Sequence, residues 1–237
     1  MDCPFEIKAN VESASIDETL SALDLKDNKA EPRSIYFWET SSVRESLYSQ
    51  GLILRLRRDV DSADCTVKFR PCDTSRLPAD WQSAKEGAGW EFRIEQDWTG
   101  AEPVLSSSLA SDLEASTADE AVLDRDATEL FSADQLELFA GYSSYELPAP
   151  KLQLLGPVRA RKWKIKLGGR KINCEEWVLD ADLRFLELSG REEDPSAAAA
   201  TRQQLLDLYE EQGVHVSTKP ELKTKVVLDF FSNKAAC

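Results

Sequence analysis

The sequence predicts an α+β protein built around an antiparallel sheet, and two patterns support this prediction. Several short stretches alternate apolar with charged residues, as in 52–58, which reads LILRLRR. Successive side chains of a strand point to opposite faces, so Arg55 and Arg57 share a cationic face opposite an apolar one. Elsewhere a serine is followed three residues later by Glu or Gln, which is typical of a helix start.

The first half of the chain is predicted to be mostly strands. We expect strands at 5–8, 33–40, 52–58, 65–70 and 90–95, a helix from the capping serine Ser15 to about Leu23, a helical turn at 41–48 closed by Gly51, and a loop at 71–88. Only a short polar turn separates the strands at 52–58 and 65–70. These two strands are therefore predicted to form a hairpin.

The second half begins with a change of composition. Residues 101–147 are rich in Ala, Ser, Leu, Asp and Glu, and we predict a helical insertion at about 101–150 in an otherwise single domain. A capping box at Ser132–Gln135 opens a helix to about Phe139, and Pro148 and Pro150 mark the return to the sheet. Strands are then expected at 152–167, 171–179, 184–189 and 223–231, with an amphipathic helix at 197–213.

Composition limits the functional classes. The 237 residues hold 43 Asp and Glu against 29 Lys and Arg, which argues against binding long nucleic acid through a basic outer surface. We find no apolar run long enough for a membrane span and no signal peptide. Five scattered cysteines and one histidine predict a reduced, cytoplasmic protein without structural zinc.

The charged strand faces have two interpretations. Each face can be the wet side of a one-sided antiparallel sheet, the usual cause of alternation. However, the strand faces carry mostly Lys and Arg although the whole chain is acidic. Like charges across neighbouring strands destabilise a sheet unless something negative lies among them. The charge bias therefore favours a site for a small polyanion.

The order of these charged stretches resembles a known family. The stretches are Glu6-x-Lys8, 36–40 (YFWET), 51–57 (GLILRLR), 66–69 (TVKF), 91–95 (EFRIE), 185–189 (FLELS) and 223–225 (KTK). Together they resemble the CYTH superfamily, the triphosphate tunnel metalloenzymes, over nearly the whole chain. This superfamily includes thiamine triphosphatases, inorganic triphosphatases, class IV adenylate cyclases and fungal-type RNA triphosphatases.

The resemblance implies a single CYTH-like domain, an antiparallel eight-stranded β-barrel or tunnel with charged faces inward and helices packed outside. It implies metal ligands at Glu6, Glu175 and Glu187, and catalytic carboxylates at Glu91 and Glu95. It implies phosphate-binding cations at Lys8, Arg55, Arg57, Lys68, Arg70, Arg93, Lys162, Lys164, Lys223 and Lys225. Arginine matches phosphate oxygens with its planar fork, and Mg²⁺ or Mn²⁺ suits carboxylate ligands.

Two departures from the family pattern weaken the implied metal site. Where the family begins E-x-E-x-K, this chain has Pro4, and the later E-x-E ends in Ser189. Glu175 and Asp180 are candidates to replace one of these two missing carboxylates. We therefore expect weakly held Mg²⁺ or Mn²⁺.

Three functions remain open at this point. The first is divalent-metal-dependent hydrolysis of a small triphosphate, such as inorganic triphosphate, thiamine triphosphate or a nucleotide-like compound. The second is non-catalytic binding of triphosphate, polyphosphate or nucleotide with a degraded metal site. The third is a class IV cyclase. For each of these functions the expected partner is a small phosphate compound, with no membrane.

Overall fold

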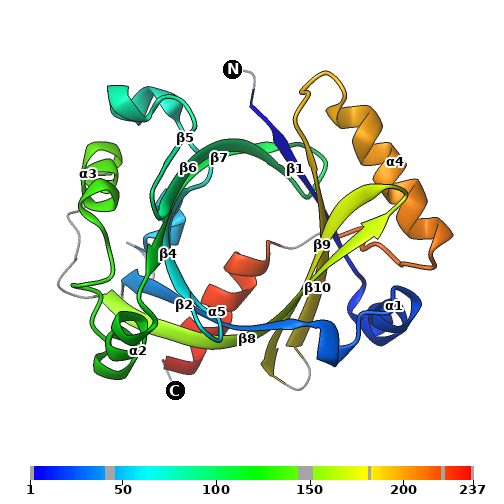
Figure 1. The fold of residues 1–237 in the computed structure, drawn as a ribbon, viewed down its shortest axis with the longest axis horizontal. Coiled ribbons are helices and arrows are strands. Elements are labelled where there is room, and N and C mark those ends of the chain that lie inside the picture. Colours follow the sequence, from blue (N-terminus) through cyan, green and yellow to red (C-terminus); the bar gives the residue numbers. More distant parts are fainter. Residues whose placement is uncertain (1–2, 41–45, 144–151, 181–182, 220–221, 236–237) are drawn as a thin grey trace. The chain divides into compact units, whose positions relative to one another are not determined.

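The computed structural model describes residues 3–40, 46–143, 152–180, 183–219 and 222–235. The strands are β1 (Phe5–Asn10), β2 (Glu31–Thr40), β3 (Leu52–Arg58), β4 (Ala63–Phe69), β5 (Lys85–Gly87), β6 (Trp90–Trp98), β7 (Val104–Leu113), β8 (Leu152–Leu167), β9 (Arg170–Asp180) and β10 (Leu183–Glu192). The α-helices are α1 (Ile16–Ala22), α2 (Ala115–Asp124), α3 (Ala133–Tyr142), α4 (Ala198–Glu211) and α5 (Lys223–Ala235) (Figure 1).

The strands form one sheet with the order β1-β10-β9-β8-β2-β3-β4-β7-β6-β5. Strand β1 also pairs with β6, so the hydrogen-bonded order returns to its beginning, as in a closed β-barrel. This confirms the predicted fold class with two corrections. The described residues contain ten strands instead of eight, and the β1–β6 pair is parallel, so the sheet is mixed.

Three elements differ from the sequence prediction. Residues 104–113 form strand β7, which pairs with β4, although we expected a helical insertion from about residue 101. The helices of that region begin only at Ala115. The stretch 223–231, expected as a strand, lies in helix α5. The β5 strand also interrupts the loop expected at 71–88.

Local signals at the ends of elements give mixed outcomes. The capping box of α3 is present, with Ser132 and Gln135 bonded to each other's backbone. Ser15 precedes α1 but its side chain makes no cap hydrogen bond, so that predicted box is wrong. Gly51 has φ of 77°, a left-handed conformation that favours glycine. Pro148, Pro150, most of the turn expected at 41–48 and Cys237 lie outside the described residues.

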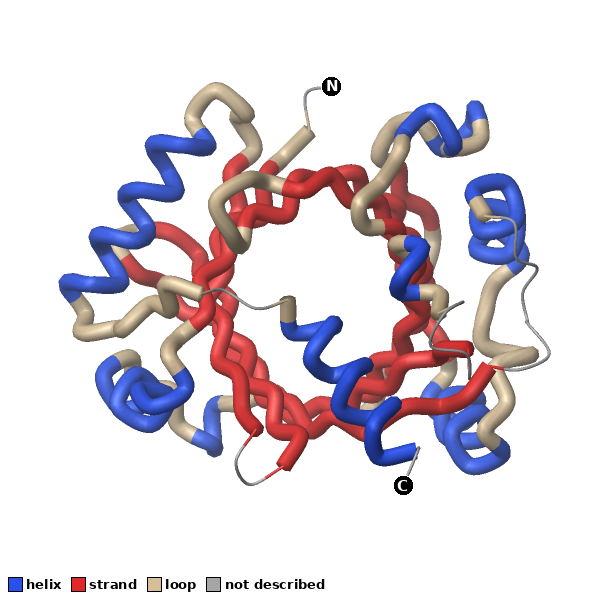
Figure 2. Tube along the Cα trace, turned by 180° about the vertical axis from the view of Figure 1, so that it is seen from behind, coloured by secondary structure: helices blue, strands red, loops and turns tan. Residues whose placement is uncertain are grey.

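The chain divides into two compact units. Unit 1 comprises residues 1–33, 95–104 and 158–230, and unit 2 comprises 34–94, 105–157 and 231–237. In unit 1, α4 packs on β1 and β10 (Figures 1 and 2). Leu205 and Tyr209 of α4 join Ile7, Cys174 and Leu188 in a hydrophobic core on that face of the strands. The opposite face of the same strands is therefore the one that carries their charges.

Unit 2 has its own core, which attaches α3 to the hairpin of β3 and β4. The ring of Phe69 stacks on Tyr142 with centroids 3.9 Å apart. The side chain of Gln135 is fully buried and donates to the carbonyl oxygens of Cys65 and Leu109, at 3.1 and 3.0 Å. One buried amide thus satisfies backbone groups of β4 and β7 under the helix.

The cysteines of the described residues are buried thiols: Cys3, Cys65, Cys72 and Cys174. Burial raises the pKa of Cys65 and of Cys174 to about 12. Such thiols are poor nucleophiles at neutral pH, so neither Cys65 nor Cys174 is a candidate catalytic nucleophile. Among the described residues, no helix is long and apolar enough to cross a membrane.

One buried charge lies on the apolar face of unit 1. Glu176 is fully buried and bonded to both Arg161 and Arg184, and Arg184 in turn contacts Asp17. We expect Glu176→Gln to lower the free energy of unfolding by about 3–5 kcal/mol, because two guanidinium groups lose their buried partner. Urea denaturation measures the change. The control Asp17→Asn should change it little because Asp17 is exposed, and equal effects of the two variants would contradict the prediction.

Candidate functional site

A compact group of three carboxylates lies on the charged face of unit 1. Ligand oxygens of Glu6, Glu95 and Asp97 are all within 4.8 Å of one another. Strand β1 brings Glu6 directly opposite Asp97 of β6, and Glu95 is two residues earlier on the same face. Glu95 and Asp97 are buried. We call these three residues the acidic triad.

Lys8 neutralises part of the acidic triad. Its Nζ lies 2.8 Å from Glu6 and 2.7 Å from Asp97, and its side chain is 11% exposed. Burial disfavours the charged ammonium, but attraction to Glu6, Asp97 and Glu187 outweighs it and raises the pKa of Lys8. Lys8 is therefore a fixed cation at neutral pH.

Ser189 lies beside this group. The β1–β10 register places Ser189 opposite Lys8 and Arg191 opposite Glu6. Arg191 reaches Glu95 at 3.7 Å. Side chains directly opposite each other share a face, so a carboxylate at position 189 would point toward Lys8 and the acidic triad.

A second ion-pair group in unit 1 is centred on Lys223, the first residue of α5. Its Nζ lies 3.1 Å from Glu175 and 3.0 Å from Glu187, and 4.5 Å from the centroid of the Trp177 ring. Burial opposes the charge, but Glu187 and Glu175 raise the pKa of Lys223. Arg33 is 4.0 Å from Glu175. Glu175 and Glu187, two of the predicted metal ligands, thus form ion pairs with Lys223 in the structure.

The remaining predicted cations of unit 1 have different surroundings. Lys162 faces Glu175 across the β8–β9 pair. Lys164 is exposed and 3.3 Å from Glu31. Lys225 is an exposed helical residue paired with Asp229 at 2.6 Å. Of these three, only Lys162 lies in register with a carboxylate of the Lys223 group.

In unit 2, the hairpin of β3 and β4 presents a cationic face. Arg55 donates a long hydrogen bond of 3.4 Å to Thr66, and Arg57 makes a two-pronged pair with Asp64, with distances of 2.7–3.0 Å. The register places Lys68 opposite Ile53, on the same face as these arginines. Asp64 therefore already occupies the fork of Arg57 in this structure.

Three further predicted residues of unit 2 are Glu91, Arg93 and Arg70. Glu91 and Arg93 are on the same face of β6 and bind each other at 2.5–2.6 Å, both being nearly half-exposed. Arg70 follows β4, and its backbone N–H donates to Gly51. The exposed ion pair of Glu91 and Arg93 contributes little to stability.

Asp97 is the site residue that the sequence analysis missed. We ended the predicted strand at residue 95, whereas β6 continues to Trp98. The alternation Glu91, Arg93, Glu95, Asp97 was present in the sequence. Extending the period-two pattern by one step would have identified the third carboxylate.

The acidic triad has the oxygen ligands that suit a divalent metal. Mg²⁺ and Mn²⁺ bind to carboxylate oxygens, and three such groups converge here. Lys8 competes for two of them. The residues therefore fit a hard divalent cation, and its affinity would depend on displacing the ammonium.

Comparisons with solved structures identify the class of fold. The chain superimposes on HpAC1 from Hippeastrum, an adenylyl cyclase candidate described with a dominant triphosphatase activity, with a TM-score of 0.56, 15% identity and 95% of each chain covered. It also superimposes on an adenylate cyclase candidate from Bacillus halodurans, with a TM-score of 0.61, 12% identity, 94% of this chain and 97% of the other covered. These matches show that the chain shares the fold of these two proteins over nearly its whole length, as the sequence resemblance predicts.

Comparisons of the sequence with protein families and with curated proteins give no match. At 12–15% identity the structural likeness establishes the fold, while function must be argued from the residues themselves.

Proposed function

We propose that this protein is a divalent-metal-dependent hydrolase of a small triphosphate compound and a divergent CYTH member. The observation that carries the proposal is the acidic triad together with Lys8 on one sheet face of unit 1. The triad supplies metal ligands, and the cationic side chains bind phosphate oxygens. When bound, the metal would offset the negative charge of the phosphates.

The roles of individual residues follow from their chemistry. We propose that Glu6, Glu95 and Asp97 hold the metal, in place of the set Glu6, Glu175 and Glu187. A carboxylate oxygen of the triad that does not contact the metal can accept a proton from the attacking water. Arg55, Arg57 and Lys68 are the proposed phosphate ligands of unit 2, because they share one face of a hairpin.

A second function, binding of triphosphate without hydrolysis, has its own supporting observation. Lysines already pair with four carboxylates of unit 1, since Lys8 contacts Glu6 and Asp97 while Lys223 contacts Glu175 and Glu187. Because lysine ammonium groups already balance the charge of these carboxylates, the folded protein does not need a metal ion to offset that charge. Pro4 and Ser189 also remove two carboxylates of the family pattern.

Phosphate release from a panel of triphosphates tests the two functions. The panel contains inorganic triphosphate, thiamine triphosphate and nucleoside triphosphates, each with Mg²⁺, with Mn²⁺ and with chelator. We expect metal-dependent release that Asp97→Asn abolishes. Calorimetric binding in chelator, without release under any condition, would favour the binder instead. If the protein neither binds nor hydrolyses any of these compounds, both proposed functions are wrong.

The cationic face of unit 2 gives a further prediction. Changing Arg55 and Arg57 together to Ala should weaken triphosphate binding at least about a hundredfold, because two charged hydrogen-bonding groups are lost. Calorimetry measures the affinity, and circular dichroism should report an unchanged fold.

Arg58→Ala is the matched control for this double variant. Arg58 follows Arg57 on β3, points to the other face and pairs with Asp119 at 2.8 Å. Its loss should leave triphosphate affinity unchanged. Unchanged affinity in the double variant, or an equal loss in Arg58→Ala, would remove Arg55 and Arg57 from the phosphate site.

A further inference from the structure

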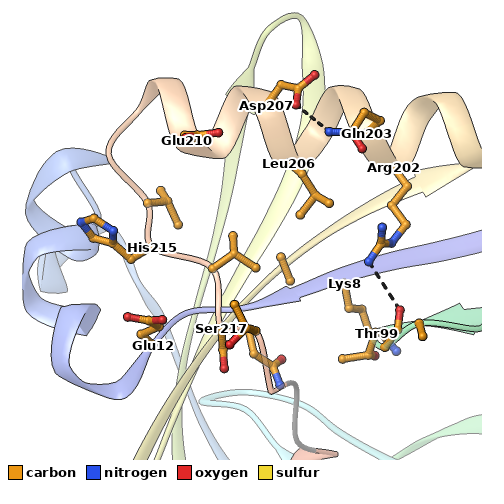
Figure 3. Close-up of a pocket in the computed structure, with 17 residues that line it drawn as sticks. Lys8, Glu12, Thr99, Arg202, Gln203, Leu206, Asp207, Glu210, His215 and Ser217 are labelled. Atoms are coloured by element: carbon orange, nitrogen blue, oxygen red, sulfur yellow. Dashed lines mark hydrogen bonds between the residues drawn. The ribbon is translucent and has the colours of Figure 1, made fainter.

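Unit 1 contains a cavity that runs along α4, and Lys8 is among the residues that line it. It has a volume of about 590 Å³ and lies between α4, the end of β1, the turn at 99–101 and the segment 214–218 (Figure 3). Cavities that bind small molecules usually measure about 300–1,000 Å³. The volume is therefore suitable for a small organic ligand.

One face of α4 gives this cavity two chemically different ends. Arg202, Leu206 and Glu210 all line it and are spaced four residues apart, so they share one face of the helix. Eight residues separate the first from the last, which is about 12 Å along the helix axis. A cationic group and a carboxylate thus lie two turns apart with an apolar side chain between them (Figure 3).

The cationic end is held in place by its neighbours. The guanidinium of Arg202 lies 5.2 Å from the centroid of the Trp98 ring and donates a long hydrogen bond of 3.4 Å to the carbonyl of Gly100. The side chain is half-buried. Because a guanidinium has five N–H donors, this arrangement leaves it able to bind an anionic group.

The other end is acidic. Glu12 follows β1, and its backbone N–H donates to His215 at 2.9 Å, which fixes the segment 214–218 beside it. Glu12 and Glu210 both line this part of the cavity (Figure 3). Leu206 provides apolar surface between Arg202 and Glu210, and Val214 also lines the cavity.

We propose that this cavity binds a small amphoteric molecule with an anionic group at Arg202, an ammonium group toward Glu12 and Glu210, and an apolar body along Leu206. The two charged ends make a simple anion or a simple cation a poorer ligand, because each would meet one repelling end. Lys8 borders both this cavity and the acidic triad. The residues that carry this proposal, Arg202, Glu12 and Glu210, are not members of the acidic triad, so the proposal does not rest on the triphosphate site.

Calorimetry with a bifunctional probe tests the proposal. Aminohexyl phosphate carries both charges on a six-carbon chain, and hexyl phosphate and hexylamine each carry one. We expect the bifunctional probe to bind the full-length protein at least about tenfold more tightly than either single-charge probe, because the second contact becomes intramolecular.

Two variants locate the probe. Glu210→Gln and Arg202→Gln should each lower the affinity for aminohexyl phosphate about fivefold, as expected for partly exposed ion pairs. Glu211→Gln is the matched control, since it removes the same charge one residue further along α4 and does not line the cavity. Binding of hexylamine should weaken in Glu210→Gln but not in Arg202→Gln, which removes a repelling charge.

Three results would overturn the proposal. They are no binding of aminohexyl phosphate, equal affinity for the single-charge probes, and equal effects of Glu210→Gln and Glu211→Gln. Binding that persists unchanged in both Glu210→Gln and Arg202→Gln, but is lost in Asp97→Asn, would place the probe at the acidic triad. The triphosphate hydrolase proposal would be untouched by any of the first three.

Discussion

Replacing Lys8 by methionine is expected to lower the free energy of unfolding by about 3–5 kcal/mol at pH 7 without divalent metal. The three carboxylates of the acidic triad have oxygens within 4.8 Å of one another, and Lys8 contacts two of them from a nearly buried position. Methionine keeps the apolar stem and removes the charge. The repulsion between Glu6 and Asp97 then loses the ammonium that lies between them.

Metal should reverse this loss. With millimolar Mn²⁺, the Lys8→Met variant should regain most of its stability, because the freed carboxylates bind the cation only in the folded state. Wild type should gain less, since its ammonium competes with the metal. Urea denaturation with Mn²⁺ and with chelator measures both effects, and no Mn²⁺ dependence in the variant would exclude the acidic triad as a metal site.

The pH dependence has a definite sign. The pKa of Lys8 is raised in the folded state, so its stabilisation is complete below the ordinary lysine value of about 10.4 and is lost only as pH rises through the higher folded value. The difference between wild type and Lys8→Met should therefore be constant from about pH 6 to 9. It should shrink near pH 4, where carboxylates ordinarily take up protons. Lys29→Met, at an exposed lysine paired with Asp24, is the control and should change little.

The sequence predicted the strands that have one clear apolar face. In β3, Leu54 and Leu56 are buried, while Arg55 and Arg57 are not. The alternation of β1, β9 and β10 follows the same rule because α1 and α4 cover only one side of these strands. Where burial decides the pattern, a period of two can be read directly.

Strand β7 could not be predicted in this way. Its sequence, VLSSSLASDL, is rich in serine and alanine, and Ser106 and Ser107 are fully buried. Small polar residues have weak strand preference, and β7 becomes a strand through its pairing with β4. Tertiary contact, which no local pattern contains, overrides the composition.

Helix α5 was misread for the opposite reason. Val226 and Val227 are β-branched and favour strands, and Lys223 and Lys225 imitate alternation. However, Lys223 and Val227 are both buried and four residues apart, which is the helical spacing. The error also concealed the pairing of Lys223 with Glu175 and Glu187, because that contact joins residues far apart in the chain.

Replacing Pro4 and Ser189 together by glutamate is expected to raise metal-dependent triphosphate hydrolysis at least about tenfold, equivalent to roughly 1.4 kcal/mol of barrier. Position 4 precedes Glu6 by two residues, and Ser189 lies opposite Lys8, so both new carboxylates would join the charged face of unit 1. More carboxylates hold a divalent cation more tightly and orient the attacking water better. Phosphate release at limiting Mn²⁺ measures the gain.

The corresponding double glutamine variant separates charge from shape. It has nearly the same side-chain size at both positions and adds no ligand charge, so its rate should stay at the wild-type level. Glutamate should also lower the Mn²⁺ concentration needed for half-maximal rate. If wild type already hydrolyses a triphosphate at ordinary enzyme rates of about 1–1,000 s⁻¹ and the glutamate variant is slower, the metal site is complete without these positions. In that case the acidic triad of Glu6, Glu95 and Asp97 would suffice, and a fourth carboxylate beside Lys8 would only bind its ammonium.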